Sequence, residues 1–205
     1  MRVQRVALPG GQRGIDATVA EMAKAAMGQY GAGSAKIRSL TLDVIRAAGV
    51  TEKDQPAEVR AVHKWVQGHL RYVRDPVWYE FVTFPETLAF DQADGDCDDH
   101  SVLESAMLGS IGIPTRFVTF SFRGGSPSHV ALQALVAGAW IPLDPIVKDK
   151  PAGWQAPDAT KTDIYGISGP DGAKAPASGL ARIVGILITL GGIVFMLRAA
   201  LKRVE

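Results

Sequence analysis

The spacing of the apolar residues changes near Gly112, and this change limits the folds that the chain can adopt. Before it, apolar residues recur every three or four positions, as in amphipathic helices, which are expected at about 16–30, 34–48 and 55–70, with a fourth after Asp96. After it, apolar and polar residues alternate as in strands, which are expected at 115–122, 129–136 and 139–143. Helices followed by an antiparallel meander predict an α+β fold.

Shifts in composition divide the chain into four segments. The helical and strand patterns together suit one domain of ordinary size. The part that follows is rich in Pro, Gly, Ala and Asp, as linkers often are, and it precedes an uncharged apolar run. We expect an N-terminal arm at 1–15, a folded domain at 16–147, a linker at 148–178 and an apolar helix at 179–202.

The overall composition excludes several classes of protein. An apolar fraction of 47% and a charged fraction of 21% are those of a globular chain. A formal net charge of +1 gives no electrostatic reason to expect nucleic-acid binding. The single cysteine excludes an internal disulfide bond and a zinc site of the CxxC type. The first residues lack the apolar core of a secretory signal, so we expect no signal peptide.

That single cysteine, Cys97, lies in the sequence GDCDDHSV at the expected start of a helix. The helix dipole and the free backbone N–H groups at such a position favour the thiolate, which is the nucleophilic form of cysteine. Negative charge opposes the thiolate, and Asp98 and Asp99, which are suited to capping the helix, lie beside it together with Asp94 and Asp96. A thiolate at Cys97 would therefore depend mainly on an ion pair with a histidine.

His129 is the histidine best suited to this role. It begins an expected strand after the segment GGSPS, so its side chain can face another element. Asp144 ends the next strand, and a tight turn at Ala137–Gly138 would bring His129 and Asp144 to the same end of the hairpin. The carboxylate can then fix the imidazole tautomer, as in a catalytic triad. The other histidines lie on expected helices, where packing or solvation is the simpler interpretation: His63, His69 and His100.

Three separated blocks resemble the transglutaminase-like, papain-related superfamily of cysteine enzymes. They are HKWVQGHLRYVRDP, GDCDDHSVLESAMLGSIGIPTRFV and SHVALQALVAGAWIPLDP, and the similarity covers about residues 16–147. The chain resembles in particular the small forms encoded by tailed phages and prophages, which also have a helical lead-in. The resemblance implies N-terminal helices and a nucleophile-bearing helix packed on an antiparallel sheet. It also implies that Cys97 is the nucleophile, His129 the general base and acid, and Asp144 the residue that orients His129.

Three further residues have weaker assignments. Gln92, five residues before Cys97, would donate to the oxyanion by analogy with papain-like enzymes, although an ordinary loop position also explains it. Trp78 and Tyr79 would line a substrate cleft, or else belong to an aromatic core.

The acidic residues around Cys97 also match part of a calcium-binding loop. The spacing of Asp94, Asp96 and Asp98 is that of the first three ligands of an EF-hand. Asp99 and Ser105, however, stand where that loop requires glycine and glutamate. We therefore expect no metal and no cofactor.

The apolar run IVGILITLGGIVFML occupies residues 183–197. As a helix extended over 179–201 it would be about 34 Å long, which is enough to cross a hydrocarbon core of about 30 Å. We expect a membrane span, or alternatively a helix buried in an oligomer or a virion. Small residues that would allow neighbouring helices to pack closely in a homo-oligomer are Gly185, Gly191 and Gly192.

Two functions from different classes follow. The first is thiol-dependent acyl transfer at amide or peptide bonds of a protein or peptide substrate. Water as the acceptor gives peptidase or amidase activity, and an amine gives transglutamination. The second is a catalytically silent structural component that uses the domain for binding. For both, we expect a phage or prophage setting and a location at a membrane or in a virion.

Overall fold

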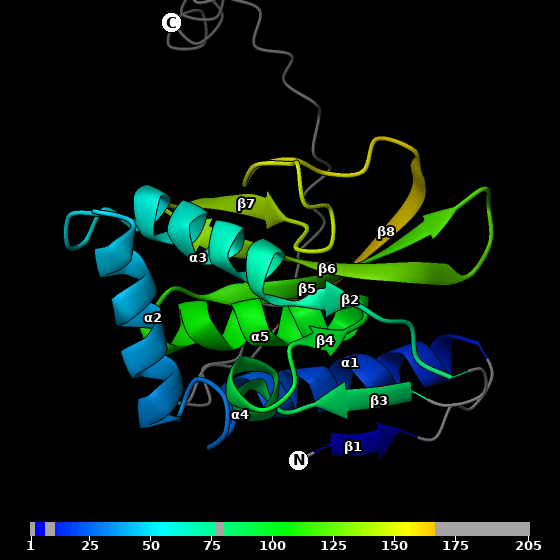
Figure 1. Cartoon of the computed structure of the whole chain (residues 1–205). Coiled ribbons are helices and arrows are strands. Elements are labelled where there is room, and N and C mark those ends of the chain that lie inside the picture. Colours follow the sequence, from blue (N-terminus) through cyan, green and yellow to red (C-terminus); the bar gives the residue numbers. More distant parts are fainter. Residues whose placement is uncertain (1–2, 7–10, 77–79, 167–205) are drawn as a thin grey trace, which may run out of the picture. The chain divides into compact units, whose positions relative to one another are not determined.

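The helices and central strands follow the expected order, with further strands at both ends of the domain (Figure 1). The computed structural model describes residues 3–6, 11–76 and 80–166, all within one unit that spans Met1–Ala175. The helices are α1 (Gln12–Met27), α2 (Ala35–Ala47), α3 (Gln55–His69), α4 (Pro85–Phe90) and α5 (Cys97–Ser110). The strands are β1 (Val3–Val6), β2 (Arg71–Tyr72), β3 (Glu80–Thr83), β4 (Asp94–Gly95), β5 (Thr115–Phe122), β6 (Pro127–Val136), β7 (Ala139–Leu143) and β8 (Ala159–Gly166).

The main sheet is antiparallel and has the strand order β7-β6-β5-β8. A two-residue turn joins β6 to β7, and both of its residues, Ala137 and Gly138, have positive φ angles of 48° and 82°. This geometry suits a tight hairpin, because two positive φ values match the twist of the flanking strands. The expected meander is therefore present, and the α+β class is confirmed.

Helix α5 is buried on all sides, because it packs against β6 and β5 and is also in contact with the other four helices (Figure 1). Its expected apolar face is fully buried, but the polar residues on its other faces are buried too. Ser105 is one of them, and its hydroxyl is 2.7 Å from the Thr115 hydroxyl of β5. A helix that is buried all round lacks a clear amphipathic pattern, so the sequence understates its burial.

Asp16 is a residue type suited to the N-cap of the helix expected at about 16–30, but α1 begins four residues before it. It begins at Gln12, after Gly11, which provides no side-chain cap. The Asp16 carboxylate instead accepts hydrogen bonds from the Gln12 amide (2.8 Å) and the Tyr165 hydroxyl (3.1 Å). Asp16 therefore links α1 to β8, a contact that local sequence does not reveal.

Two segments that were expected to be irregular contain strands. In the expected arm at 1–15, β1 pairs antiparallel with β3. In the expected linker at 148–178, β8 pairs antiparallel with β5 along its whole length. The prediction of irregular structure is therefore wrong at these strands. The reason is that each strand is added to a strand distant in the sequence, whereas composition reports only local preference.

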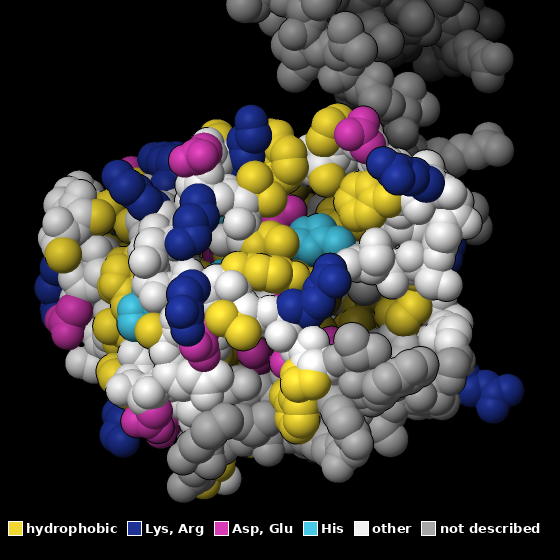
Figure 2. Space-filling model, turned by 45° about the vertical axis from the view of Figure 1, so that its right-hand side comes forward, with side chains coloured by type: hydrophobic (Ala, Val, Ile, Leu, Met, Phe, Trp, Pro, Cys, Tyr) yellow, Lys and Arg dark blue, Asp and Glu magenta, His cyan; other side chains and the backbone are white. Residues whose placement is uncertain are grey.

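The apolar run at 179–202 lies outside the described residues, and so does most of the expected linker beyond β8. Within the described part of the chain, no helix is both long and apolar enough to cross a membrane. On the face shown in Figure 2, basic, acidic and apolar side chains are interspersed, in keeping with a net charge of +1.

Candidate active site

Cys97 is the first residue of α5, as its position in the sequence predicts. Asp96 is the N-cap of this helix, and its carboxylate accepts a hydrogen bond from the backbone N–H of Asp98 (3.3 Å). The backbone N–H of Cys97 lies in the first turn, where amide groups have no partner within the helix. The thiol therefore lies at the positive end of the helix dipole and also beside the capping carboxylate.

The two aspartates that follow Cys97 do not act as the caps that the sequence indicated. The Asp99 carboxylate accepts hydrogen bonds from the backbone N–H (2.8 Å) and the hydroxyl (3.4 Å) of Thr83, which ties α5 to the end of β3. Asp98 is buried; one of its oxygens accepts from the backbone N–H of Asp99 (2.8 Å), and the other has no partner among the described residues. Their main effect is to anchor α5, and burial raises the pKa of both carboxyl groups.

His129 and Asp144 are brought together by the β6–β7 hairpin. Leu132 of β6 pairs with Leu143 of β7, so Asp144, the residue after β7, comes close to the start of β6. The His129 Nε2–H donates to Asp144 Oδ2 at 2.8 Å. Only 12% of the histidine side chain and 5% of the aspartate side chain are exposed. Burial of this pair strengthens the hydrogen bond, because little water competes for it.

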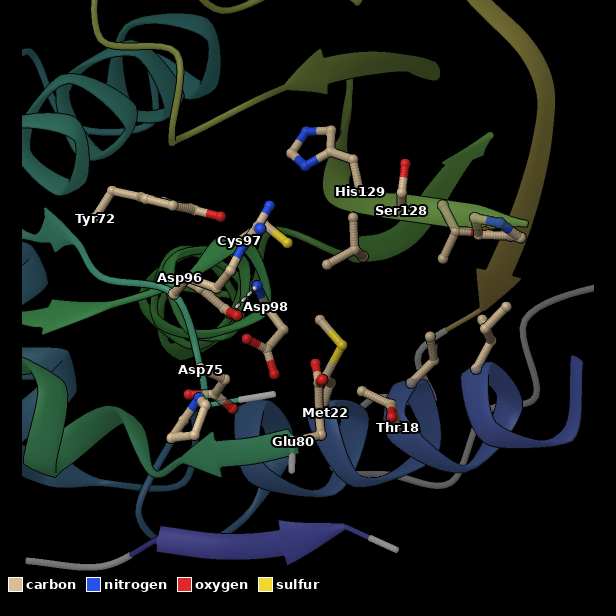
Figure 3. A pocket seen from close by; sticks show the side chains of 17 residues that line it. Thr18, Met22, Tyr72, Asp75, Glu80, Asp96, Cys97, Asp98, Ser128 and His129 are labelled. Carbon is tan, nitrogen blue, oxygen red and sulfur yellow. Dashed lines mark hydrogen bonds between the residues drawn. The ribbon is translucent and has the colours of Figure 1, made fainter. Parts of the chain in front are cut away.

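A cavity of about 410 Å³ contains both Cys97 and His129 in its lining. Figure 3 shows one ring nitrogen of His129 turned toward Cys97. It is Nδ1, since Nε2 is bonded to Asp144. No hydrogen bond joins the Cys97 sulfur to His129 in the described part of the chain. Apolar residues of α1 line the cavity on one side: Ile15, Val19 and Met22.

The other three histidines are not among the residues that line this cavity. His63 is paired with Glu104 at 3.0 Å. His69 stacks on Trp65 and contacts the carbonyl of Leu88 at 3.1 Å. The imidazole of His100 bonds back to the carbonyl of Asp96 (2.7 Å), and its burial lowers its pKa.

The electrostatics of the site disfavour a thiolate. Burial, followed by the nearby charge of Asp96, raises the pKa of the Cys97 thiol to about 12. Burial, with the charges of Asp96 and Asp75, raises the pKa of Glu80 to about 7. Both burial and the charge of Asp96 favour the neutral thiol over the ion pair with His129 that the sequence predicted.

Three carboxylates in the cavity wall lie as close together as the ligands of a cation. Oxygen atoms of Glu80, Asp96 and Asp98 lie within 4.8 Å of one another. Oxygen ligands of this number suit a hard divalent cation. Protons can relieve the same repulsion, because burial raises the pKa of Asp98 and Glu80. The geometry is equally that of a set of carboxyl groups that share protons.

The weaker assignments have mixed outcomes. The Gln92 amide donates to the carbonyl of Asp94 (3.3 Å), and Gln92 is not among the residues that line the cavity. This position gives no support to the expected oxyanion role. Trp78 and Tyr79 lie outside the described residues. Tyr72, which the sequence did not single out, lines the cavity, and its hydroxyl points toward Cys97 in Figure 3.

Comparison with protein families places this site in a known context. Residues 44–145 match the model of the family described as the transglutaminase-like superfamily. The matched range includes α3, α4, α5 and the strands β2 to β7, and also all three residues Cys97, His129 and Asp144. No curated protein sequence matches the chain significantly.

Solved structures that resemble the chain do so at low sequence identity. A candidate cysteine protease from Cytophaga hutchinsonii is 19% identical, with a TM-score of 0.42 over 80% of this chain and 58% of that one. A candidate protease from Parabacteroides distasonis is 16% identical, with a TM-score of 0.48 over 62% of this chain and 26% of that one. A TGase is 14% identical, with a TM-score of 0.41 over 62% and 35% of the two chains. The chain thus spans well under two thirds of the length of each.

Proposed function

Because residues 44–145 match the model of the transglutaminase-like superfamily, we propose that the protein is a thiol-dependent acyl-transfer enzyme that acts on amide or peptide bonds. One observation carries the proposal. The buried hydrogen bond from His129 to Asp144 leaves Nδ1 of His129 free to face a cavity that Cys97 also lines. A nucleophile, a base and a group that orients the base are the minimum that this chemistry requires.

In the proposed mechanism, His129 Nδ1 takes the proton from Cys97 as the sulfur attacks the carbonyl carbon of an amide. The imidazolium then donates this proton to the leaving amine, the C–N bond breaks and an acyl thioester remains on Cys97. Water or a second amine attacks the thioester, His129 removes its proton, and the thiol is restored. Asp144 holds the tautomer and stabilises the imidazolium.

The raised pKa of the thiol changes one step of this mechanism. A cysteine with a pKa of about 12 does not rest as a thiolate at neutral pH. Proton transfer to His129 therefore accompanies the attack on the substrate. A bound substrate that excludes water and brings Cys97 and His129 together would favour this step.

Two groups in the cavity suit the developing oxyanion. The backbone N–H of Cys97 is one, since it lies in the first turn of α5, where amide groups have no partner within the helix. We assign the second donor to the Tyr72 hydroxyl, in place of Gln92, because Tyr72 points toward Cys97 and lines the cavity. Both would act on charge that forms only in the transition state.

The proposal is tested with a mixed peptide library, incubated with the protein in the presence and absence of a primary amine and read by mass spectrometry. Cleaved or deamidated peptides would indicate a hydrolase, and amine adducts would indicate a transglutaminase. Cys97→Ala and His129→Ala should each abolish the products. Products that persist in either variant would contradict the proposed chemistry.

A second candidate is a catalytically silent binding domain, and the raised pKa of Cys97 favours it. A neutral thiol without a hydrogen bond to His129 is also what a retained but unused site would have. The peptide library separates the two candidates, because a binding domain would retain peptides without modifying them. Retention that Cys97→Ala leaves unchanged would support the binding function.

Association with a membrane or a virion is a further part of the proposal, and it rests on the sequence of residues 179–202 alone. A phage or prophage origin likewise rests only on the sequence resemblance. We expect the full chain to float with lipid vesicles or to co-purify with an assembly, and a chain that ends at Gly172 to do neither. A full chain that stays monomeric without detergent would contradict this expectation.

A further inference from the structure

Three polar side chains are buried next to the candidate site but have no part in the proposed mechanism. His63 and Gln67 belong to α3, and Glu104 belongs to α5. Their exposed fractions are 2%, 6% and 0%. Buried polar groups are costly unless they are hydrogen-bonded, so the contacts of these three residues decide what they contribute.

His63 and Glu104 form an ion pair between α3 and α5. The His63 Nδ1–H lies 3.0 Å and 3.2 Å from the two oxygens of the Glu104 carboxylate. Burial would lower the pKa of His63, but Glu104, the carbonyl of Lys150 and the charge of Asp144 together raise it. These contacts favour a proton on His63, which lies close enough to Asp144 to be affected by its charge.

Gln67 connects this pair to the segment that follows Asp144. Its side-chain amide is 3.0 Å from His63 Nε2, and it donates to the backbone carbonyls of Val147 (2.9 Å) and Lys150 (3.0 Å). These two hydrogen bonds use both amide hydrogens of Gln67. Gln67 therefore has no hydrogen left for His63 Nε2, and a hydrogen on Nε2 is directed to the carbonyl of Lys150.

The segment that Gln67 holds begins at Asp144 itself. The backbone N–H of Val147 donates to the carbonyl of Asp144 (3.3 Å), and the N–H of Lys150 donates to the carbonyl of Val147 (3.0 Å). The Asp144 carboxylate has one partner, His129, because its Oδ1 is buried without a hydrogen bond among the described residues. Its orientation therefore depends on the backbone that Gln67 fixes.

We propose that Gln67, together with the His63–Glu104 ion pair, positions Asp144 and thereby the imidazole of His129. The proposal rests on the proposed function, since the orientation of His129 matters only if His129 acts as the base. Gln67 fixes the backbone after Asp144 through two carbonyl groups, and the His63–Glu104 pair lies directly against the Gln67 amide. Precise support of this kind is what keeps a catalytic group in its productive geometry.

The test compares Gln67→Met with His69→Gln. Methionine fills a similar volume but cannot donate to the two carbonyls. His69 is on the same helix and makes a single carbonyl contact, to Leu88, so it is the matched control. The first readout is the low-field proton resonance of the His129–Asp144 hydrogen bond in protein with ¹⁵N-labelled histidine, assigned by its loss in His129→Ala. The second is the rate at which an activated ester acylates Cys97, measured across pH.

We expect Gln67→Met to shift or broaden the His129 resonance and to lower the acylation rate about tenfold near neutral pH, with His69→Gln unchanged in both. An unchanged resonance in folded Gln67→Met would overturn the proposal, as would an equal change in His69→Gln. If Gln67→Met does not fold, Gln67→Asn, which is shorter by one methylene, is judged by the same criteria. The resonance does not require turnover, so a wild-type protein that fails to acylate would count against the proposed function alone.

Discussion

The charge of Asp96 should control the reactivity of Cys97, and the substitution Asp96→Asn tests this directly. Asparagine is as good an N-cap as aspartate, so α5 should keep its first turn while the negative charge beside the thiol is removed. Burial has the largest effect on the pKa of Cys97, and the charge of Asp96 has the next largest. A neighbouring unit charge at an effective dielectric of about 20 is worth a few kcal/mol, and one pKa unit corresponds to about 1.4 kcal/mol.

The magnitude follows from the raised pKa. With a pKa of about 12, about one Cys97 in 10⁴ is ionised at pH 8, whereas about a quarter of an ordinary cysteine is ionised there. Iodoacetamide should therefore alkylate the unliganded wild-type protein about a thousandfold more slowly than it alkylates free cysteine. Lowering the pKa by at least one unit in Asp96→Asn should raise the rate about tenfold or more.

The assay is simple, because Cys97 is the only cysteine in the chain and intact mass reports its alkylation directly. The control is Asp94→Asn, since Asp94 is paired with Arg71 at 2.9 Å and its charge is already compensated. We expect this control to alkylate at the wild-type rate. A wild-type rate above that of free cysteine at pH 8 would refute the reasoning, and so would an unchanged rate in Asp96→Asn.

Three further outcomes are expected. The free energy of unfolding, measured with urea, should fall by on the order of 2 kcal/mol from about pH 5 to pH 8. Burial raises the pKa of Glu80 to about 7 and that of Asp99 to about 8, so the folded state holds more protons than the unfolded state in this range. A rise in the free energy of unfolding over the same range would contradict this sign. Ala137→Gly should raise that free energy by about 0.5–1 kcal/mol, because Ala137 has a φ of 48° that glycine adopts without strain; a loss of stability would show that the turn is not strained. Tyr72→Phe should lower the acylation rate about 10²-fold with little effect on substrate binding, if the hydroxyl serves the oxyanion; an unchanged rate would remove Tyr72 from that role.

The sequence predicted those parts of the site that depend on local pattern. The start of α5 at Cys97 follows from the acidic segment before an apolar period of three to four. The meeting of His129 with Asp144 follows from alternation in two strands joined by a two-residue turn. In both cases, a short stretch of chain contains all the information that the geometry needs.

The remaining parts depend on contacts between distant elements. The Asp99 carboxylate of α5 accepts a hydrogen bond from Thr83 of β3, and Glu104 of α5 pairs with His63 of α3. Neither partner can be inferred from the spacing of residues along one segment. Tyr72 belongs to a two-residue strand, which is too short to leave a pattern. The raised pKa of Cys97 results mainly from burial, a property of the whole fold that composition around the cysteine does not report.

Covalent acylation of Cys97 is the most direct measurement of the proposed chemistry. The full chain is mixed with a chromogenic ester such as p-nitrophenyl acetate, and intact mass is followed together with release of the chromophore. We predict a burst of about one equivalent, with the acyl group on Cys97, strongly reduced in His129→Ala and in Asp144→Asn. Acylation at equal rates in wild type and His129→Ala, or no acylation of Cys97 at all, would contradict a Cys97–His129–Asp144 acyl-transfer site.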